Sequence, residues 1–497
     1  MPAAEQPISG QFSVESIALV NQHQQSIDIR DLVQEFRLNE SIHNKFCSAT
    51  FAIADGVDLI KNFKMTGQEF IRISIKQKEG TPEEPIDDAV SENSIDKTFR
   101  IFKIDNLKQN VRNAPMQQYL IRCVEPRLYT CRRTRLSRVF RGSYDDILEN
   151  IFVNHAKIAI EEFDHWEETE PDNIQFIAPN WTVGSVIDHC LNHASKGNTS
   201  VWRNGMFFYQ TLNGGFRFKS IDKMFEDEFP VTFSMYPRTS TADTTVIDVN
   251  AAGGVNSQII SIEKPQLFDT LQGTVGGAYA SKLEAYDPVR KLSEDASYDI
   301  KETFGRQRDK HLSKVPMLHI DKEKGEFFLT TENQTDPMIP PKITELDNDL
   351  APNEYNHDQR EALVVNTYSM NHSWDDASDI TVDPLHRGVE SKDNSRLERI
   401  ALLETLEQNR CIITIPLRTD LSVGTIIKLE VPPQQPSVEG HKHEDQLNDN
   451  RYLITDIAVH AQPQKHRGHM VLECSKESYK KEPARVLDEL LPVTEEI

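Results

Sequence analysis

Cys411-Ile412-Ile413-Thr414-Ile415-Pro416-Leu417 opens the part of the sequence that decides the fold, residues 410–474. Its odd-numbered positions place four apolar side chains on one face of a strand, and residues 424–431 repeat this two-residue period. After a polar loop, residues 451–460 and 468–474 predict two further strands. Four antiparallel strands with one apolar face are not stable alone in water. The sequence therefore predicts that another part of the chain, or another subunit, covers them.

Length and net charge limit the classes of protein that this sequence can encode. A chain of 497 residues exceeds one ordinary core, and about three domains are expected. The formal net charge of -23 opposes general attraction to nucleic acid or to an anionic membrane. No run of about eighteen apolar residues occurs, and residues 1–11 form a polar arm. Neither a membrane span nor a secretion signal is expected.

The cysteines are predicted to be reduced and buried. They form no Cys-x-x-Cys pair, and most of them lie in apolar-periodic strands where a small hydrophobic side chain fits. A disulfide framework is the less favoured alternative. The six residues are Cys47, Cys123, Cys131, Cys190, Cys411 and Cys474.

Residues 12–125, after the polar arm, are predicted to form a first β-rich domain. Ile71, Ile73 and Ile75 align on one face of a strand. Residues 99–124 predict a pair of strands around a polar connection. Residues 79–97 are acidic and contain proline, which predicts a solvated or disordered loop between two strands.

Residues 126–225 are predicted to be a compact α+β domain with two helices and a β-meander. Ser143 and Thr182 are N-cap candidates, and apolar residues at helical spacing follow each of them. Asn204-Gly205 and Asn213-Gly214-Gly215 predict tight hairpin turns, because glycine tolerates positive φ.

The rest of the chain is less regular. Strand character returns at residues 245–264, whereas residues 265–384 show only scattered strands among many Asp, Asn and Pro residues. Apolar residues three apart within residues 391–409 predict a helix that leads into the C-terminal strands. Residues 479–497 form a tail with a short helix expected near its middle.

No motif with a specific chemical mechanism is present. The sequence lacks a Gly-x-Gly-x-x-Gly segment after a strand, a Gly-x-x-x-x-Gly-Lys-Ser/Thr loop, a His-Glu-x-x-His helix and a Gly-x-Ser-x-Gly turn. We therefore expect a protein that is not an enzyme, and we assign no catalytic, cofactor-binding or metal-binding residue and no cofactor.

Three groups of histidines were weighed as metal ligands, because imidazoles close in sequence can share one ion. For each group a solvated, surface or capping role is favoured, since no third ligand can be identified. The groups are His441 with His443, His460 with His466 and His469, and His189 with His193.

Paired acids and a group of aromatic residues were weighed in the same way. Glu161-Glu162 and Glu167-Glu168 could serve as a hydrolytic acid and base, but neighbouring acids are common in a highly charged chain. The aromatic residues could form a stacking platform for bases or sugars. Packing on the two preceding helices is favoured, because consecutive strand residues point to opposite faces. They are Trp202, Phe207, Phe208, Tyr209, Phe216 and Phe218.

Several weak patterns in a fixed order carry a resemblance to a known family. They are the run from Leu38 to Ile75, Asn180-Trp181-Thr182 followed by Val201 to Phe208, Leu421 to Thr425, and Tyr452 to His460. Their joint order resembles the central baseplate hub protein of contractile-tailed bacteriophages, which is related to the hub-like part of type VI secretion spike proteins. The likeness covers the larger part of the chain.

The resemblance implies a mainly β fold with α+β parts and two small antiparallel β-barrel, tube-like domains. Residues 12–125 would form the first barrel, and residues 226–264 plus 410–478 the second. Residues 126–225 would be the α+β domain, and residues 265–409 a long irregular insertion that ends in a helix. The outer strand edges of the second barrel would be candidates for joining subunits.

The same resemblance implies a virion structural protein of the tail baseplate, made in the host cytoplasm. Three chains would form a pseudo-sixfold ring that adapts a sixfold tail tube to a threefold central spike. The expected partners are two further copies of the chain, the tail-tube protein, the central spike protein and other baseplate proteins. DNA would only pass through the channel, and acidic residues lining the channel would repel it.

Two alternatives belong to other classes. One is a tail-associated or cell-wall-directed hydrolase, which requires a cleft where His, Asp and Glu side chains converge. The other is a type VI secretion spike protein, which would favour a repetitive β-helix after the last strands.

Overall fold

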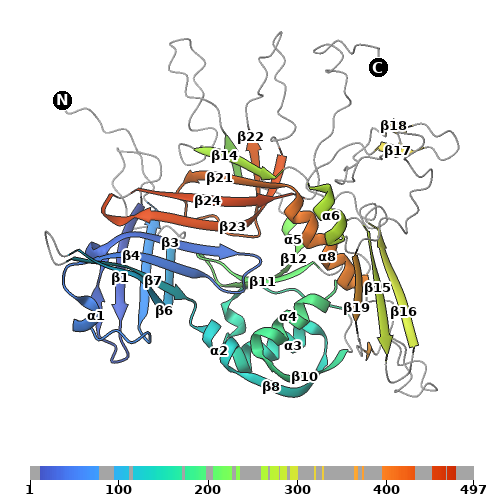
Figure 1. Ribbon diagram of the computed structural model, residues 1–497, viewed down its shortest axis with the longest axis horizontal. Coiled ribbons are helices and arrows are strands. Elements are labelled where there is room, and N and C mark those ends of the chain that lie inside the picture. The colour runs from blue at the N-terminus through green and yellow to red at the C-terminus, as the bar shows by residue number, and fades with distance from the viewer. Residues whose placement is uncertain are drawn as a thin grey trace, which may run out of the picture.

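The computed structural model describes most of the chain and shows a mainly β protein, as the sequence predicts (Figure 1). A 13-stranded sheet dominates the fold. The described residues are 12–77, 94–110, 116–170, 174–196, 205–226, 231–234, 259–266, 269–278, 280–287, 292–299, 318–320, 327–329, 363–367, 372–373, 394–430, 450–465 and 467–476.

The N-terminal half of the sheet has the strand order β3-β4-β7-β6-β5-β1-β2. Alternating apolar positions explain these strands, since Ile71, Ile73 and Ile75 are all fully buried. The short helix α1 (Leu59–Asn62) follows β4, where the buried Asp55 accepts hydrogen bonds from the backbone N–H groups of Val57 and Leu59. The strands are β1 (Phe12–Val20), β2 (Ser26–Asp28), β3 (Val33–Ser41), β4 (Ser48–Asp55), β5 (Phe70–Gln77), β6 (Ser94–Asn110) and β7 (Met116–Val124).

The C-terminal half contains the four strands predicted from residues 410–474, and all four are confirmed. The odd-numbered positions of the first strand, from Cys411 to Leu417, are fully buried. The order β14-β21-β24-β23 continues the sheet, while β22 pairs with β23 and β13 pairs with β22. The strands are β13 (Val231–Ser234), β14 (Ser261–Gln266), β21 (Arg410–Pro416), β22 (Ile426–Glu430), β23 (Asn450–Gln462) and β24 (Arg467–Ser475).

Other parts of the same chain cover the apolar face of the C-terminal strands. The helix α8 (Asn394–Gln408) buries Leu397 and Leu402 in the core that these strands share with the N-terminal half. The backbone of Gly468 in β24 packs closely, since an added Cβ would lie 2.6 Å from Leu417 and 3.0 Å from Phe12. The sequence predicts that the apolar face is covered either by another part of the chain or by another subunit. In the structure, another part of the chain covers it.

The pairing of the described strands leaves the sheet open, and barrel closure is not confirmed. The two halves are joined edge to edge by β3 and β23, which are antiparallel neighbours. The edge of β23 that was a candidate for joining subunits is thus occupied by a strand of its own chain.

The α+β region lies beneath the sheet in Figure 1 and has a second core of its own. Both predicted N-caps are confirmed: Ser143 Oγ accepts from the N–H of Asp146 at 3.3 Å, and Thr182 Oγ1 from that of Ser185 at 3.2 Å. The elements are α2 (Arg127–Arg133), β8 (Arg135–Gly142), α3 (Tyr144–Ile151), β9 (Phe163–His165), β10 (Ile174–Thr182), α4 (Val183–His193), β11 (Met206–Gln210), β12 (Phe216–Ser220) and α5 (Ile221–Phe225).

The aromatic residues of the meander are core residues, as predicted. Phe207 packs in the core of the large sheet, whereas Phe208 packs in the core of the α+β region. Every residue of β11 is buried, because the strand is covered by one core on each face. Trp202 lies outside the described residues.

The insertion is more regular than predicted, because its described residues include a three-stranded sheet of order β16-β15-β19. The predicted helix is α8, whose fully buried positions include Leu397, Ala401 and Leu402. Leu397 and Ala401 are four residues apart, so the buried face includes spacings of four residues as well as the spacings of three that predicted the helix. The other elements are α6 (Thr270–Gly276), β15 (Ala280–Asp287), β16 (Leu292–Asp299), β17 (Leu318–Ile320), β18 (Phe327–Leu329), β19 (Leu363–Thr367) and β20 (His372–Ser373).

All six cysteines are buried and free, which confirms the predicted thiols. Burial raises the pKa of Cys131 and of Cys411 to about 11. Several sequence predictions lie outside the described residues: the arm 1–11, most of the loop 79–97, the tail 479–497, and His441, His443 and His466. Among the described helices, none has the length and apolar character needed to cross a membrane.

Candidate functional site

The pairing of Phe36–Ser41 in β3 with Asp456–Ala461 in β23 joins the two halves of the sheet, and we call it the seam. The backbone N–H of Ile42 continues the ladder by donating to the Thr455 carbonyl at 3.0 Å. Phe36, Leu38 and Val459 are fully buried along this pairing. One apolar core therefore runs without a break from one half of the sheet to the other.

A buried carboxylate lies at the end of the seam. The Glu40 side chain accepts the backbone N–H of Leu212 at 2.5 Å and that of Val423 at 2.8 Å. Leu212 belongs to the turn between β11 and β12, and Val423 to the loop before β22. Glu40 therefore connects the N-terminal half of the sheet, the α+β region and the C-terminal half.

The sequence contains a signal for Glu40 that motif searching does not detect. Phe36, Leu38 and Ile42 are buried positions of the same two-residue repeat, and Glu40 occupies the inward position between them. A charged residue at an inward position requires hydrogen-bond partners from elsewhere in the fold. Which backbone groups supply them depends on the tertiary structure and could not be predicted.

Burial raises the pKa of Glu40 to about 7, although the two backbone N–H groups oppose this shift. In the unfolded state the carboxyl group has its ordinary pKa of 4.5. Between pH 4.5 and about pH 7 the folded state therefore holds a proton that the unfolded state has released. The contribution of Glu40 to stability is therefore greatest at or below pH 4.5. It declines as the pH rises to about 7 and is constant above that value.

We expect Glu40→Gln, which cannot titrate, to lack this pH dependence. Between pH 5 and pH 8 the wild-type chain should lose about 2.5 kcal/mol of unfolding free energy relative to the variant. Thermal unfolding of both proteins at a series of pH values measures the difference, since other titrating groups contribute equally to both. Parallel profiles would show that Glu40 has an ordinary pKa.

A second set of polar contacts holds the β11–β12 hairpin against the first half of the sheet. The Gln210 side chain accepts the N–H of Cys47 at 3.1 Å and donates to Glu125 at 3.0 Å. Arg127 donates to Glu125 at 2.9 Å and also pairs with Glu162. The hairpin is thus held through side chains as well as through its apolar residues.

Helix α8 has a buried arginine at the opposite side of the same hairpin. Arg399 donates to the Met206 carbonyl at 2.7 Å and to Asn192 Oδ1 at 3.0 Å. Its guanidinium carbon lies 5.2 Å from the centre of the Phe207 ring. Burial lowers the pKa of Arg399 to about 10, so the side chain stays charged at neutral pH.

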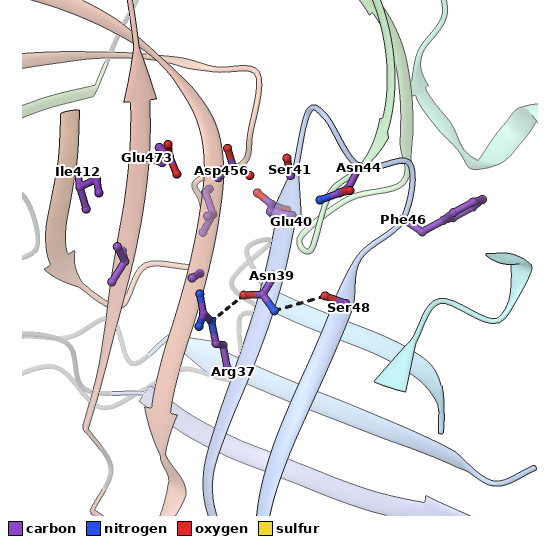
Figure 2. Close-up of a pocket in the computed structure, with 13 residues that line it drawn as sticks. Arg37, Asn39, Glu40, Ser41, Asn44, Phe46, Ser48, Ile412, Asp456 and Glu473 are labelled. Atoms are coloured by element: carbon purple, nitrogen blue, oxygen red, sulfur yellow. Dashed lines mark hydrogen bonds between the residues drawn. The ribbon is translucent and has the colours of Figure 1, made fainter. Parts of the chain in front are cut away.

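A pocket of about 200 Å³ opens at the seam (Figure 2). Arg37 donates to Asn39 at 2.8 Å, and Asn39 contacts the Ser48 hydroxyl at 3.4 Å. Asp456 of β23 and Glu473 of β24 line the pocket from the strands that continue the sheet beyond β3.

Two of the three carboxylates that line this pocket, Glu40 and Glu473, are engaged in holding the sheet together. Glu40 accepts two backbone N–H groups, and Glu473 forms an ion pair with Arg410. A hydrolytic site needs two carboxyl groups that are free to act as acid and base. Among the carboxylates that line the pocket, Glu40 and Glu473 are already bonded within the fold.

One residue of each pair of neighbouring acids, Glu162 and Glu167, has structural partners. Glu162 is bound by Arg127 and accepts the N–H of Ala159 at 3.3 Å. Glu167 is buried, and its oxygens accept the N–H and the hydroxyl of Ser220.

The described histidines of the groups considered as metal ligands, His189, His193, His460 and His469, pack with aromatic rings or with each other. The rings of His189 and His193 lie 4.3 Å apart, and His189 also contacts Phe176 at 4.6 Å. His460 and His469 are opposite each other in β23 and β24 and stack at 5.1 Å. Within the part of the chain that the structure describes, no three His, Cys, Asp or Glu residues are arranged to hold a metal ion.

No family model and no curated protein matches the sequence. Among solved structures, the chain is similar to a tail protein from Neisseria meningitidis at 9% identity and a TM-score of 0.49, covering 94% of this chain and 97% of that one. It is similar to the 43 kDa tail protein of prophage MuSo2 from Shewanella oneidensis at 6% identity and a TM-score of 0.47, covering 93% and 98%. It is also similar to a type VI secretion system component from Escherichia coli at 9% identity and a TM-score of 0.41, covering 95% and 79%.

Proposed function

We propose that the protein is a structural hub protein of a contractile phage-tail baseplate. Three chains form a pseudo-sixfold ring that adapts a sixfold tail tube to a threefold spike and lets DNA pass during ejection. Its partners in the virion are two further copies, the tube protein, the spike protein and other baseplate proteins.

One structural observation carries this proposal. Each chain contains two β units, β1–β7 and the group β13, β14 and β21–β24, which are joined side by side at the seam. A chain with two adjacent β units supplies six units when three copies close into a ring. The order of sequence patterns that resembles the hub family supports the same assignment.

We also propose that each of the two β units forms a small barrel. β14 and β2 are the terminal strands along the main path of the sheet, one in each half. Unpaired strand edges favour pairing with another chain. With β23 already paired to β3, we assign the contacts between subunits to these outer strands.

A structural role fits the use of the buried charged side chains. Glu40, Glu125, Glu167 and Arg399 all bridge elements far apart in the sequence. We therefore propose that the protein has no catalytic activity of its own. The net charge of -23 suits a channel that DNA crosses without binding.

The oligomeric state tests this proposal. Three chains of 56.9 kDa give a particle of about 171 kDa, which native mass spectrometry distinguishes from smaller forms. Class averages of negatively stained particles are expected to show a ring with a central opening. A stable monomer at micromolar concentration would overturn the hub assignment.

A further inference from the structure

Five exposed arginines lie close together on this acidic chain, along α2 and β8. We call them the arginine ribbon: Arg132, Arg133, Arg135, Arg138 and Arg141. Among the described residues, none of the five forms an ion pair with a carboxylate. The chain has 78 acidic residues against 55 basic ones, so five neighbouring arginines without acidic partners stand out from its overall charge.

Two arginines of the ribbon contact other groups of the fold. Arg135 donates to the Asn180 carbonyl at 3.1 Å, and the guanidinium of Arg138 lies 5.0 Å from the centre of the Phe140 ring. Burial is the main cause that lowers the pKa of His155, and the positive charges of Arg138 and Lys157 lower it further. Contacts within the fold therefore position Arg135 on the outer face of β8 and Arg138 on the face of Phe140.

An exposed aliphatic pair lies between the arginines. Val139 in β8 and Ile177 in β10 are opposite each other in the ladder, and their exposed fractions are 41% and 64%. Arg135 and Arg141 share this outer face with Val139, because residues two apart in a strand point the same way. Phe140 points inward and is buried.

The strand that carries this face is at the end of its sheet. The order of the three-stranded sheet is β20-β10-β8, so β8 is paired on one side only among the strands that the structure describes. In Figure 1, β8 runs along the lower rim of the molecule, below α3. A terminal strand presents backbone N–H and C=O groups to which another extended segment can pair.

We propose that β8 binds an extended acidic segment of a partner protein, which adds to the sheet as an antiparallel strand. Side chains directly opposite in such a pair lie about 4.5–5.5 Å apart. Acidic residues of the segment pair with Arg141 and Arg135, and an aliphatic residue between them lies opposite Val139 and covers it. The matching pattern is Glu-x-Val-x-Thr-x-Glu, read from Arg141 towards Arg135.

A protein segment fits this surface better than a nucleic acid. Val139 contributes to binding only when a partner covers it with apolar groups, and arginine beside apolar residues is typical of protein interfaces. Binding of single-stranded nucleic acid uses exposed aromatic rings for stacking. The aromatic residues next to the pair, Phe140 and Phe176, are buried. The net charge of -23 also repels a polyanion at long range.

The test uses the full-length chain and a fluorescent nine-residue probe, Thr-Glu-Thr-Val-Thr-Thr-Thr-Glu-Thr, with binding followed by fluorescence anisotropy at low salt. The wild-type chain should bind the probe saturably. Arg141→Ser should weaken binding roughly fivefold and Val139→Thr roughly threefold. Arg72→Ser and Val57→Thr are matched controls, because both residues are exposed and lie outside β8 and β10.

Three outcomes would overturn the inference. They are the absence of saturable probe binding, equal losses in Arg141→Ser and Arg72→Ser, and tighter binding of a nine-nucleotide oligothymidylate that depends on the same arginines. The inference goes beyond the proposed hub role and does not depend on it, since the probe binds one chain in any oligomeric state. Failure of the ring and failure of probe binding are therefore distinguishable.

Discussion

Replacing Glu40 with leucine is expected to lower the unfolding free energy by about 2–4 kcal/mol at pH 6. The substitution leaves the backbone N–H groups of Leu212 and Val423 buried without their acceptor. Each such loss costs about 1–3 kcal/mol, and the leucine regains part of it by burying apolar surface. Because the carboxylate connects three parts of the chain, the loss should also reduce the cooperativity of unfolding.

Glu35→Leu is the matched control, because Glu35 lies on the same strand with about half of its side chain exposed. Its expected effect is within about 0.5 kcal/mol. Differential scanning calorimetry measures both variants, and limited proteolysis near the β11–β12 turn reports whether the hairpin is released. Equal midpoints for the two variants would contradict the structural role of Glu40.

A second large effect is expected at Gly424, next to the loop that Glu40 holds. Gly424 has a φ of +75°, and an added Cβ would lie 2.1 Å from the Tyr209 hydroxyl oxygen. Gly424→Ala therefore introduces both backbone strain and a clash with a fully buried ring. We expect a loss of about 2–4 kcal/mol in unfolding free energy.

Gly56→Ala is the control for this substitution, since nothing lies within 4 Å of a Cβ added there. Its thermal midpoint should stay close to that of the wild-type chain. Gly424→Ala together with Tyr209→Phe removes the nearest clashing atom and should recover part of the loss. Equal unfolding temperatures for Gly424→Ala and Gly56→Ala would contradict the close packing of this turn on Tyr209.

The strands of the large sheet could be predicted because their side chains alternate. The run from Cys411 to Leu417 and the run from Ile71 to Ile75 each place every second residue in the core. The strands of the insertion were harder to recognise, since β15 and β16 carry many charged and small residues. Periodicity identifies a strand only when one of its faces is apolar.

The seam could not be predicted from the sequence, for a different physical reason. Leu38 and Val459 meet in the ladder, but no local pattern indicates which edge strand a given strand will pair with. The contacts of Glu40 and Arg399 depend on the same long-range pairing. The five arginines of the ribbon lie close together in the sequence. Their exposure and the position of β8 at the end of a sheet could not be predicted, because both depend on the tertiary structure.

The seam also has a consequence for biosynthesis. Ser41 and Asp456 are opposite each other in the ladder and are separated by 415 positions, the difference between their residue numbers. At 5–20 residues per second, a ribosome needs roughly 20–80 s to make the intervening chain. During that interval the outer edge of β3 has no partner from its own chain. Nascent chains on the same messenger RNA therefore expose the unpaired edge of β3 to one another until the C-terminal residues emerge. Slow translation would for this reason favour aggregation over folding.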